Sequence, residues 1–497
     1  MKVLETYEVE SEGVPAEVAI VEEPSEYVRI YELRHTRLRE ATAVALNYLK
    51  EKIIEGVNIK VSEILDPREG ERVKQRLVAK AHEIVRLELS GLTDDEERII
   101  VGRLSQEMLG LGELELILAD ENLEELVVNS SREPVWVYHK RHGWLKSNVY
   151  LTSEEQIHNY ASIIGRRVGR QITNLSPLLD ANLGTGDRVN ATLFPISTHG
   201  NTITIRKFAK DPWTICNLIT NGTITPEAAS LIWLAMQYEM SMIVGGGTGS
   251  GKTSMLNSLL IFTPPNQRVI TIEDTRELVL PEFLNWVPMS TRQPNPEGRG
   301  GVEMLDLMVN SLRMRPDRIV LGEIRRQREA EVLFEAIHTG HSVYGTLHAD
   351  DASQVKQRLT NPPISLPEML VGSLQMILVQ YRQRRTGVRR TYEIAELLQT
   401  NDGASLNIVY KLDAREDKLR KVGDFLRISN DLIMHTGMTQ KEIFEDMRGK
   451  QSVLEAMVDK QIAKVNDVGR VIAGYYMDKD NVVNLAEKGQ IVKLLLE

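Results

Sequence analysis

Cysteine, long apolar runs and excess positive charge are all scarce in this sequence of 497 residues. The single cysteine, Cys216, excludes an internal disulfide and any zinc site built from clustered cysteines, and it is most simply a buried apolar residue. No apolar run approaches the roughly 18 to 20 residues that would span a bilayer. The formal net charge of −10 argues against sequence-independent nucleic-acid binding, because such binding requires a basic surface.

The start of the sequence carries no sign of export. It lacks the charged beginning, apolar stretch and small-residue cleavage site of a secretory signal, and it turns acidic at once. We therefore expect a cytoplasmic protein, in a reducing compartment that suits a chain with one cysteine.

The composition is that of a globular protein, with 42% apolar and 26% charged residues. At roughly 100 to 200 residues per domain, the length predicts three folded units. Helical spacing dominates the beginning and end of the chain, short apolar runs with turns fill the middle, and strand and helix signals alternate after it. We predict a mostly helical domain over residues 1–92, an α/β domain over 93–212, a parallel α/β core over 213–400 and a helical extension over 401–497.

The most specific motif is a phosphate-binding loop at residues 246–253, which matches G-x-x-x-x-G-K-[ST] in full between an apolar strand and a helical run. Its glycines allow backbone N–H groups to surround phosphates at a helix N-terminus. The Lys252 ammonium would reach the β and γ phosphates, and the Thr253 hydroxyl would coordinate Mg²⁺. The alternative is a glycine-rich turn that matches by chance. The predicted site for ATP and Mg²⁺ consists of Gly246, Gly247, Thr248, Gly249, Ser250, Gly251, Lys252 and Thr253.

Two acidic positions are candidates for holding the metal or the attacking water. Glu323 is the first carboxylate after an apolar strand at 318–321, where Gly322 replaces the usual aspartate. Glu273 and Asp274 end another strand, and parallel strands deliver their carboxyl ends to the same edge of a sheet. The simpler alternative for each is a solvated charge at a strand end.

Histidines and arginines complete the set of candidates. His341 and His348 bracket a third strand, and His348 should face the nucleotide, where it could hydrogen-bond a phosphate oxygen. A satisfied structural histidine is the alternative for either. Arg188 and Arg206 lie on two strand candidates ahead of the core and could supply the cation that phosphoryl transfer commonly takes from outside the P-loop. Taken singly, most arginines are surface charges.

The order of these motifs resembles the type II/type IV secretion ATPase superfamily, which includes secretion, pilus and archaellum motors. Residues 246–253 look like its Walker A motif, 270–274 like its Asp box, 312–325 like its atypical Walker B motif and 340–349 like its His box. The missing Walker B aspartate is the expected state in this family.

The resemblance implies a homohexamer in which a smaller α/β, PAS-like domain packs on a RecA-like ATPase domain and moves against it. It maps arginine fingers onto Arg188 and Arg206, and assigns catalysis and metal binding to Glu273 and Glu323 without deciding which is the base. It places Lys252 and His348 in catalysis, Thr253 and Glu323 at Mg²⁺, and His341 at the nucleotide.

The resemblance also implies partners. Segments 110–114, 122–126 and 134–139 look like the archaeal branch, and one cysteine cannot build the zinc insertion of many bacterial homologues. We therefore expect the archaeal branch or the tight-adherence type, without zinc. The implied partner is a polytopic platform protein of the cytoplasmic membrane, with pilin-like subunits reached indirectly, so the chain would be peripherally membrane-associated.

A nucleic-acid motor of conjugation or RecA type is the main alternative. The basic segments 381–385 and 389–390 contain one aromatic and could grip a phosphate backbone, although a solvated face is the commoner explanation. We expect no direct nucleic-acid partner. A nucleotide-gated ring without turnover is a third reading, and the presence of both Lys252 and Glu323 speaks against it.

Overall fold

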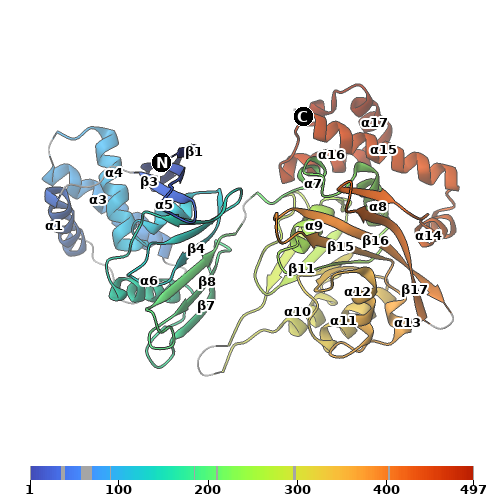
Figure 1. Cartoon of the computed structure of the whole chain (residues 1–497), viewed down its shortest axis with the longest axis horizontal. Helices are drawn as coiled ribbons and strands as arrows, with labels where there is room; N and C mark the ends of the chain where they lie inside the picture. The colour runs from blue at the N-terminus through green and yellow to red at the C-terminus, as the bar shows by residue number, and fades with distance from the viewer. Residues whose placement is uncertain are drawn as a thin grey trace. The chain divides into compact units, whose positions relative to one another are not determined.

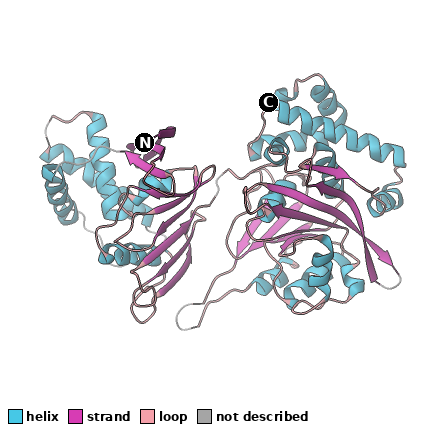
Figure 2. Cartoon of the chain, in the orientation of Figure 1, coloured by secondary structure: helices cyan, strands magenta, loops and turns pink. Residues whose placement is uncertain are grey.

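The computed structural model of the chain describes residues 2–34, 40–56, 70–89, 91–183, 185–208, 211–294, 298–400 and 403–495. The chain divides into two compact units, Met1–Ala209 and Lys210–Glu497 (Figure 1). Each unit contains a nine-stranded sheet with helices packed on it, so the protein is a mixed α/β protein (Figure 2).

The first unit is built on a largely antiparallel sheet, in the order β1-β2-β3-β6-β5-β4-β9-β8-β7. One pair of neighbours, β3 and β6, is parallel. The strands are β1 (Lys2–Ser11), β2 (Val14–Glu22), β3 (Ile30–Arg34), β4 (Leu123–Val128), β5 (Trp136–His139), β6 (Gly143–Ser147), β7 (Leu178–Asn182), β8 (Arg188–Thr192) and β9 (Thr202–Arg206). The helices are α1 (Glu40–Gly56), α3 (Gly70–Glu88), α4 (Asp94–Leu109), α5 (Leu114–Ala119) and α6 (Glu154–Arg167).

The prediction of a mostly helical domain over residues 1–92 is wrong for its first third. Residues 2–34 form β1, β2 and β3, and β3 pairs with β6 through Ile30 and Lys146, so these strands extend the sheet of the middle region. The signal was the alternation of Val14, Ala16 and Val18, which are buried, with Pro15, which is exposed, and Glu17, which is half-buried. Part of this region, residues 57–69, lies outside the described residues.

The second unit has a parallel core, in the order β12-β11-β13-β14-β10-β15, followed by antiparallel β16, β17 and β18. The strands are β10 (Met242–Gly246), β11 (Arg268–Glu273), β12 (Asn285–Ser290), β13 (Arg318–Leu321), β14 (Ser342–Leu347), β15 (Met376–Arg382), β16 (Arg389–Thr400), β17 (Gly403–Asp413) and β18 (Lys418–Lys421). The helices are α7 (Ile215–Thr220), α8 (Pro226–Gln237), α9 (Lys252–Leu260), α10 (Met304–Ser311), α11 (Gln327–His338), α12 (Ala352–Thr360), α13 (Glu368–Val371), α14 (Arg427–Thr436), α15 (Gln440–Asp459), α16 (Val465–Met477), α17 (Lys479–Glu487) and the 3-10 helix η1 (Ile491–Leu495).

The expected helical extension over 401–497 also begins differently. Its first described residues form β17 and β18, which continue the sheet from β16, and helices follow only from Arg427. An alternating strand at the edge of a sheet is a weak pattern beside the strongly periodic helices that follow it.

Both faces of the parallel core are covered. On β10, Met242 and Val244 belong to the hydrophobic cluster under α8, α9 and α15, whereas Ile243 belongs to the cluster under α10, α11 and α12. Figure 1 shows these two groups of helices on opposite sides of the sheet. Burial on both faces explains the continuous apolar runs of the core strands and leaves their carboxyl ends as the edge where polar groups gather.

Within the described ranges, no helix has both the length and the hydrophobicity needed to cross a membrane.

Candidate functional site

The phosphate-binding loop has the backbone geometry that its sequence predicts. It follows β10, and α9 begins at Lys252. Gly249 and Gly251 adopt φ angles of 69° and 92°, in the left-handed region that disfavours side chains. These two glycines therefore allow the loop to wrap closely before the helix starts.

Lys252 is only 8% exposed, and its ammonium lies inside the loop. Lys252 Nζ donates to the Gly247 carbonyl at 2.9 Å and contacts His348 Nδ1 at 3.2 Å. Burial lowers the pKa of Lys252, and Glu323 opposes that shift. The hydroxyl of Ser250 is buried in the same loop and has no hydrogen-bond partner among the described residues.

His348 connects the loop lysine to Glu323. Its Nε2 lies 3.1 Å from Glu323 Oε1, while its Nδ1 faces Lys252. Because an ammonium can only donate, Nδ1 accepts and Nε2 carries the proton toward the carboxylate. Burial, followed by the charge of Lys252, lowers the pKa of His348, so the ring is neutral at pH 7.

Arg325 extends this chain of contacts and is a residue that the sequence analysis did not single out. Its Nε donates to Glu323 Oε2 at 2.8 Å, and its Nη1 pairs with Asp274 Oδ2 at 2.5 Å. A continuous polar chain therefore runs from Lys252 through His348, Glu323 and Arg325 to Asp274. The clue in the sequence was an arginine two residues after a catalytic carboxylate candidate, which alone carries little weight.

Glu273 lies next to this chain but is held differently. The side chain is 2% exposed, and its Oε1 accepts the backbone N–H groups of Glu277 and Leu278 at 2.9 and 3.1 Å. Its Oε2 is buried without a partner among the described residues. Burial raises the pKa of Glu273 from 4.5 to about 7, so this carboxyl holds its proton more tightly than an ordinary glutamate does.

This pKa predicts a pH-dependent stability difference. A carboxyl that holds its proton more tightly when folded stabilises the fold fully below pH 4.5, and that stability is lost as the pH rises through about 7. Glu273→Gln cannot titrate. In urea titrations without nucleotide, we therefore expect the variant to gain about 3 kcal/mol relative to wild type between pH 4.5 and 8.

The matched control is Glu282→Gln, which changes an exposed carboxylate in the segment after β11. Because substitutions on the surface usually change stability by less than about 0.5 kcal/mol, this variant should be as stable as wild type at each pH. A flat difference for Glu273→Gln as well would show that Glu273 ionises normally.

The structure does not bring His341 to the phosphate-binding loop of its own unit, and its expected place at the nucleotide stays a prediction. His341 precedes β14, whose other end leads to His348. Its Nδ1 contacts the Thr339 hydroxyl at 3.0 Å and the Ala336 carbonyl at 3.2 Å. A strand places its two ends at opposite edges of the sheet, so only the histidine after β14 reaches the site.

Arg188 and Arg206 belong to the first unit, where they are direct cross-strand partners on β8 and β9. Arg188 Nη2 pairs with Asp180 Oδ2 at 2.9 Å. The structure therefore brings the two arginines together with one another, on strands whose inward residues Val189 and Ile205 are buried.

ATP and Mg²⁺ fit the chemistry of the loop. A cradle of glycines, a buried ammonium and an unpartnered serine hydroxyl are the groups that a polyphosphate requires. Thr253 is half-buried in the first turn of α9, and together with Glu323 it offers oxygen ligands of the kind that Mg²⁺ prefers.

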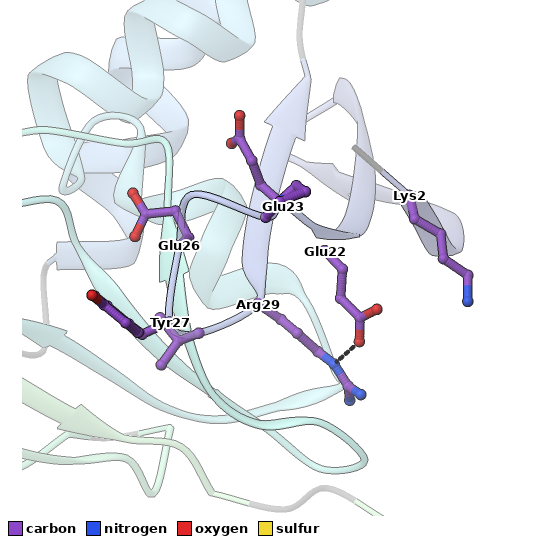
Figure 3. Close-up of a pocket in the computed structure, with 8 residues that line it drawn as sticks. Lys2, Glu22, Glu23, Glu26, Tyr27 and Arg29 are labelled. Carbon is purple, nitrogen blue, oxygen red and sulfur yellow. Dashed lines mark hydrogen bonds and ion pairs between the residues drawn. The ribbon is translucent and has the colours of Figure 1, made fainter.

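A pocket of about 530 Å³ lies elsewhere, in the first unit, over the turn between β2 and β3 (Figure 3). Its lining comes mainly from residues 22–29, and Arg29 Nε contacts Glu22 Oε1 at 2.9 Å across it. Tyr27 is fully exposed there. The pocket is an open feature of one surface turn and takes no part in the candidate site.

Comparison with known proteins agrees with these observations. The model of the family described as "Type II/IV secretion system protein" matches residues 174–459. The chain is 33% identical to an uncharacterized protein of Methanocaldococcus jannaschii over 407 residues, which cover 80% of this chain and 71% of that protein. It is 30% identical to a putative conjugal transfer protein of Mycobacterium tuberculosis, over 65% of this chain and 95% of that protein. It is 31% identical to the type IV secretion system protein PtlH of Bordetella pertussis, over 55% of this chain and 89% of that protein.

Proposed function

This chain belongs to the type II/IV secretion system protein family, and from that membership we propose that it is an ATPase motor. It hydrolyses ATP at residues 246–253 to drive assembly or retraction of a type IV filament, or type II protein secretion, through a membrane platform protein. The observation that carries this proposal is the contact of Lys252 with Glu323 through His348, which joins a phosphate-binding cation to a carboxylate at the same sheet edge.

The roles of the residues follow from that contact. When bound, ATP supplies the phosphoryl group and Mg²⁺ supplies positive charge against its oxygens. Lys252 would hold phosphate oxygens in place of the Gly247 carbonyl, and Thr253 and Glu323 would hold the metal. Glu323 orients the attacking water, and the neutral ring of His348 keeps this carboxylate in place by donating from Nε2.

The remaining parts of the proposal concern assembly. The working form is a homohexamer, in which the sheet of the first unit corresponds to the PAS-like domain and the second unit to the RecA-like domain of the family. Arg188 and Arg206 act as arginine fingers on the transferred phosphoryl group. A polytopic membrane protein is the platform, and the Methanocaldococcus jannaschii relative supports the archaeal branch.

The test measures both the ATP turnover and the assembly state of the protein. We expect purified full-length protein to hydrolyse ATP only with Mg²⁺, and to have the mass of a hexamer in solution in the active fraction. Because Arg206 would remain, Arg188→Ala should lower kcat about tenfold while ATP binding persists.

The matched control for that substitution is Arg34→Ala. Arg34 is likewise exposed in the first unit and pairs with Glu17 at 2.9 Å, as Arg188 pairs with Asp180. Equal activity of Arg188→Ala and Arg34→Ala would remove the arginine-finger assignment. Absence of turnover in every assembly state, including with a platform protein present, would remove the motor assignment.

A nucleic-acid motor is the second candidate, favoured by the relative described as a putative conjugal transfer protein. Exposed Arg384 and Arg385 in the turn between β15 and β16 are the residues that would grip a strand. If single-stranded DNA accelerates turnover severalfold and Arg384→Ala with Arg385→Ala abolishes the acceleration, this candidate replaces the first.

A further inference from the structure

The hairpin formed by β15 and β16 lies beside the phosphate-binding loop. β10 and β15 are parallel neighbours, and Gly246 at the end of β10 is in register with Gln380. Two residues further along, Arg382 ends β15, and Arg389 begins β16 directly across from it. The register of the sheet therefore places two arginines level with the loop.

Both arginines contact the loop at its glycines. Arg389 Nε donates to the Gly249 carbonyl at 2.9 Å. A Cβ atom on Gly251 would lie 3.5 Å from Arg389 Cδ, and one on Gly249 would lie 2.9 Å from Arg382 Nη1. Arg382 Nε is buried there without a hydrogen-bond partner among the described residues.

The basic segment of the hairpin therefore divides into two parts. Arg382 and Arg389 face the loop, whereas Arg384 and Arg385 are exposed in the turn. Arg390 turns away as well, because its Nη2 pairs with Asp417 Oδ2 at 2.7 Å. Arg382 and Arg389 can therefore interact with the phosphate-binding loop.

We propose that Arg389, supported by Arg382, is a positioning residue that sets the orientation of the peptide between Gly249 and Ser250. In a trans peptide the C=O and N–H groups point in opposite directions. With its carbonyl held by Arg389, this peptide directs the Ser250 N–H to the interior of the loop, where it donates to the Gly247 carbonyl at 3.3 Å. That carbonyl also receives Lys252 Nζ, so this N–H lies where phosphate oxygens bind.

The position of the peptide explains why a clamp is needed. Its carbonyl belongs to Gly249, and glycine places little restriction on the backbone, so the peptide can rotate and turn this carbonyl inward. An inward carbonyl would repel phosphate. A guanidinium on the carbonyl also polarises the peptide and strengthens its N–H as a donor. Arg389 thereby favours the anion-binding orientation before a nucleotide arrives.

This inference rests on the proposed nucleotide site, and its test separates the two. In full-length protein, ATP and ADP affinities and steady-state kinetics are measured for wild type, Arg389→Ala, Arg389→Lys and Arg382→Ala. The matched control is Arg385→Ala, which removes one exposed arginine from the same hairpin. We expect Arg389→Ala to raise KM and both dissociation constants about tenfold with kcat within about twofold, the effect of one charge-assisted hydrogen bond.

Arg389→Lys should recover most of the affinity, because an ammonium can also donate to the Gly249 carbonyl, and Arg382→Ala should show a smaller loss of the same kind. The inference is overturned if Arg389→Ala binds nucleotide as Arg385→Ala does, or if it loses kcat without a change in KM. If wild type itself binds no ATP, both the proposed function and this inference are wrong. If every variant binds nucleotide as wild type does, only this inference is wrong.

Discussion

Replacing Glu323 with glutamine is expected to lower kcat about a thousandfold while ATP still binds, which would be the largest effect of any single substitution on turnover. Glu323 accepts from His348 Nε2 and from Arg325, and glutamine keeps the size of the side chain but loses the charge that orients water and holds metal. Lys252 and the loop backbone, which hold the phosphates, are left intact. ATP binding should therefore persist in this variant while ATP turnover falls.

The measurement is single-turnover ATP hydrolysis beside equilibrium binding of ATP with Mg²⁺. Glu335→Gln, an exposed carboxylate on α11, is the matched control and should behave as wild type. If Glu323→Gln keeps its turnover and Glu273→Gln loses it, Glu273 is the base and Glu323 has only a supporting part. If both retain turnover, neither carboxylate acts in the reaction.

The second large effect concerns stability and is expected for Asp446→Asn. Lys450 on α15 is fully buried and pairs with Asp446, which also accepts from Tyr475 at 2.8 Å and contacts Lys479 Nζ at 2.6 Å. Burial lowers the pKa of Lys450, and Asp446 opposes that shift. Removing the carboxylate charge leaves a buried ammonium without compensation, so we expect a loss of about 3 to 5 kcal/mol in the free energy of unfolding.

The substitution is tested by urea titration at pH 7, in comparison with the exposed pair on the same helix, Lys441 and Glu445. Glu445→Gln should change nothing measurable, because exposed pairs contribute little. The double variant Asp446→Asn with Lys450→Met should regain most of the lost stability, since it removes the buried charge together with its partner. An Asp446→Asn protein as stable as wild type would mean that Lys450 is neutral in the fold.

The sequence pattern was sufficient to predict those features that depend on residues adjacent in the chain. The loop at 246–253 depends on glycine conformations and on a strand and a helix next to it in sequence, so its place after β10 could be predicted. The strand that leads to Glu323 was predictable for the same reason. The contacts of Glu323 with His348 and Arg325 were not, because they depend on which strands are neighbours in the sheet.

The sequence pattern failed at the beginning of the predicted domain 1–92 and at the beginning of the predicted extension 401–497. Residues 2–34 alternate only weakly and stand before strongly periodic helices, whereas their third strand, β3, pairs with β6 more than a hundred residues later. Likewise, β18 is the edge strand of its sheet, and β17 lies between it and β16. A smaller share of the side chains is buried on β17 and β18 than on β10, where every residue is buried, so their apolar pattern in the sequence is weaker.

By itself, the sequence determined the family, the phosphate-binding loop and the residue types available at the carboxyl ends of the strands, because these depend on residues adjacent in the chain. Only the tertiary structure decided which of them meet. His341 and His348 lie at opposite ends of β14. Burial raises the pKa of Glu273 above that of an ordinary carboxyl. The pairing of β15 with β10 brings Arg389 to Gly249. Contacts, burial and charge between distant residues exist only once the sheet has formed, and no short segment encodes them.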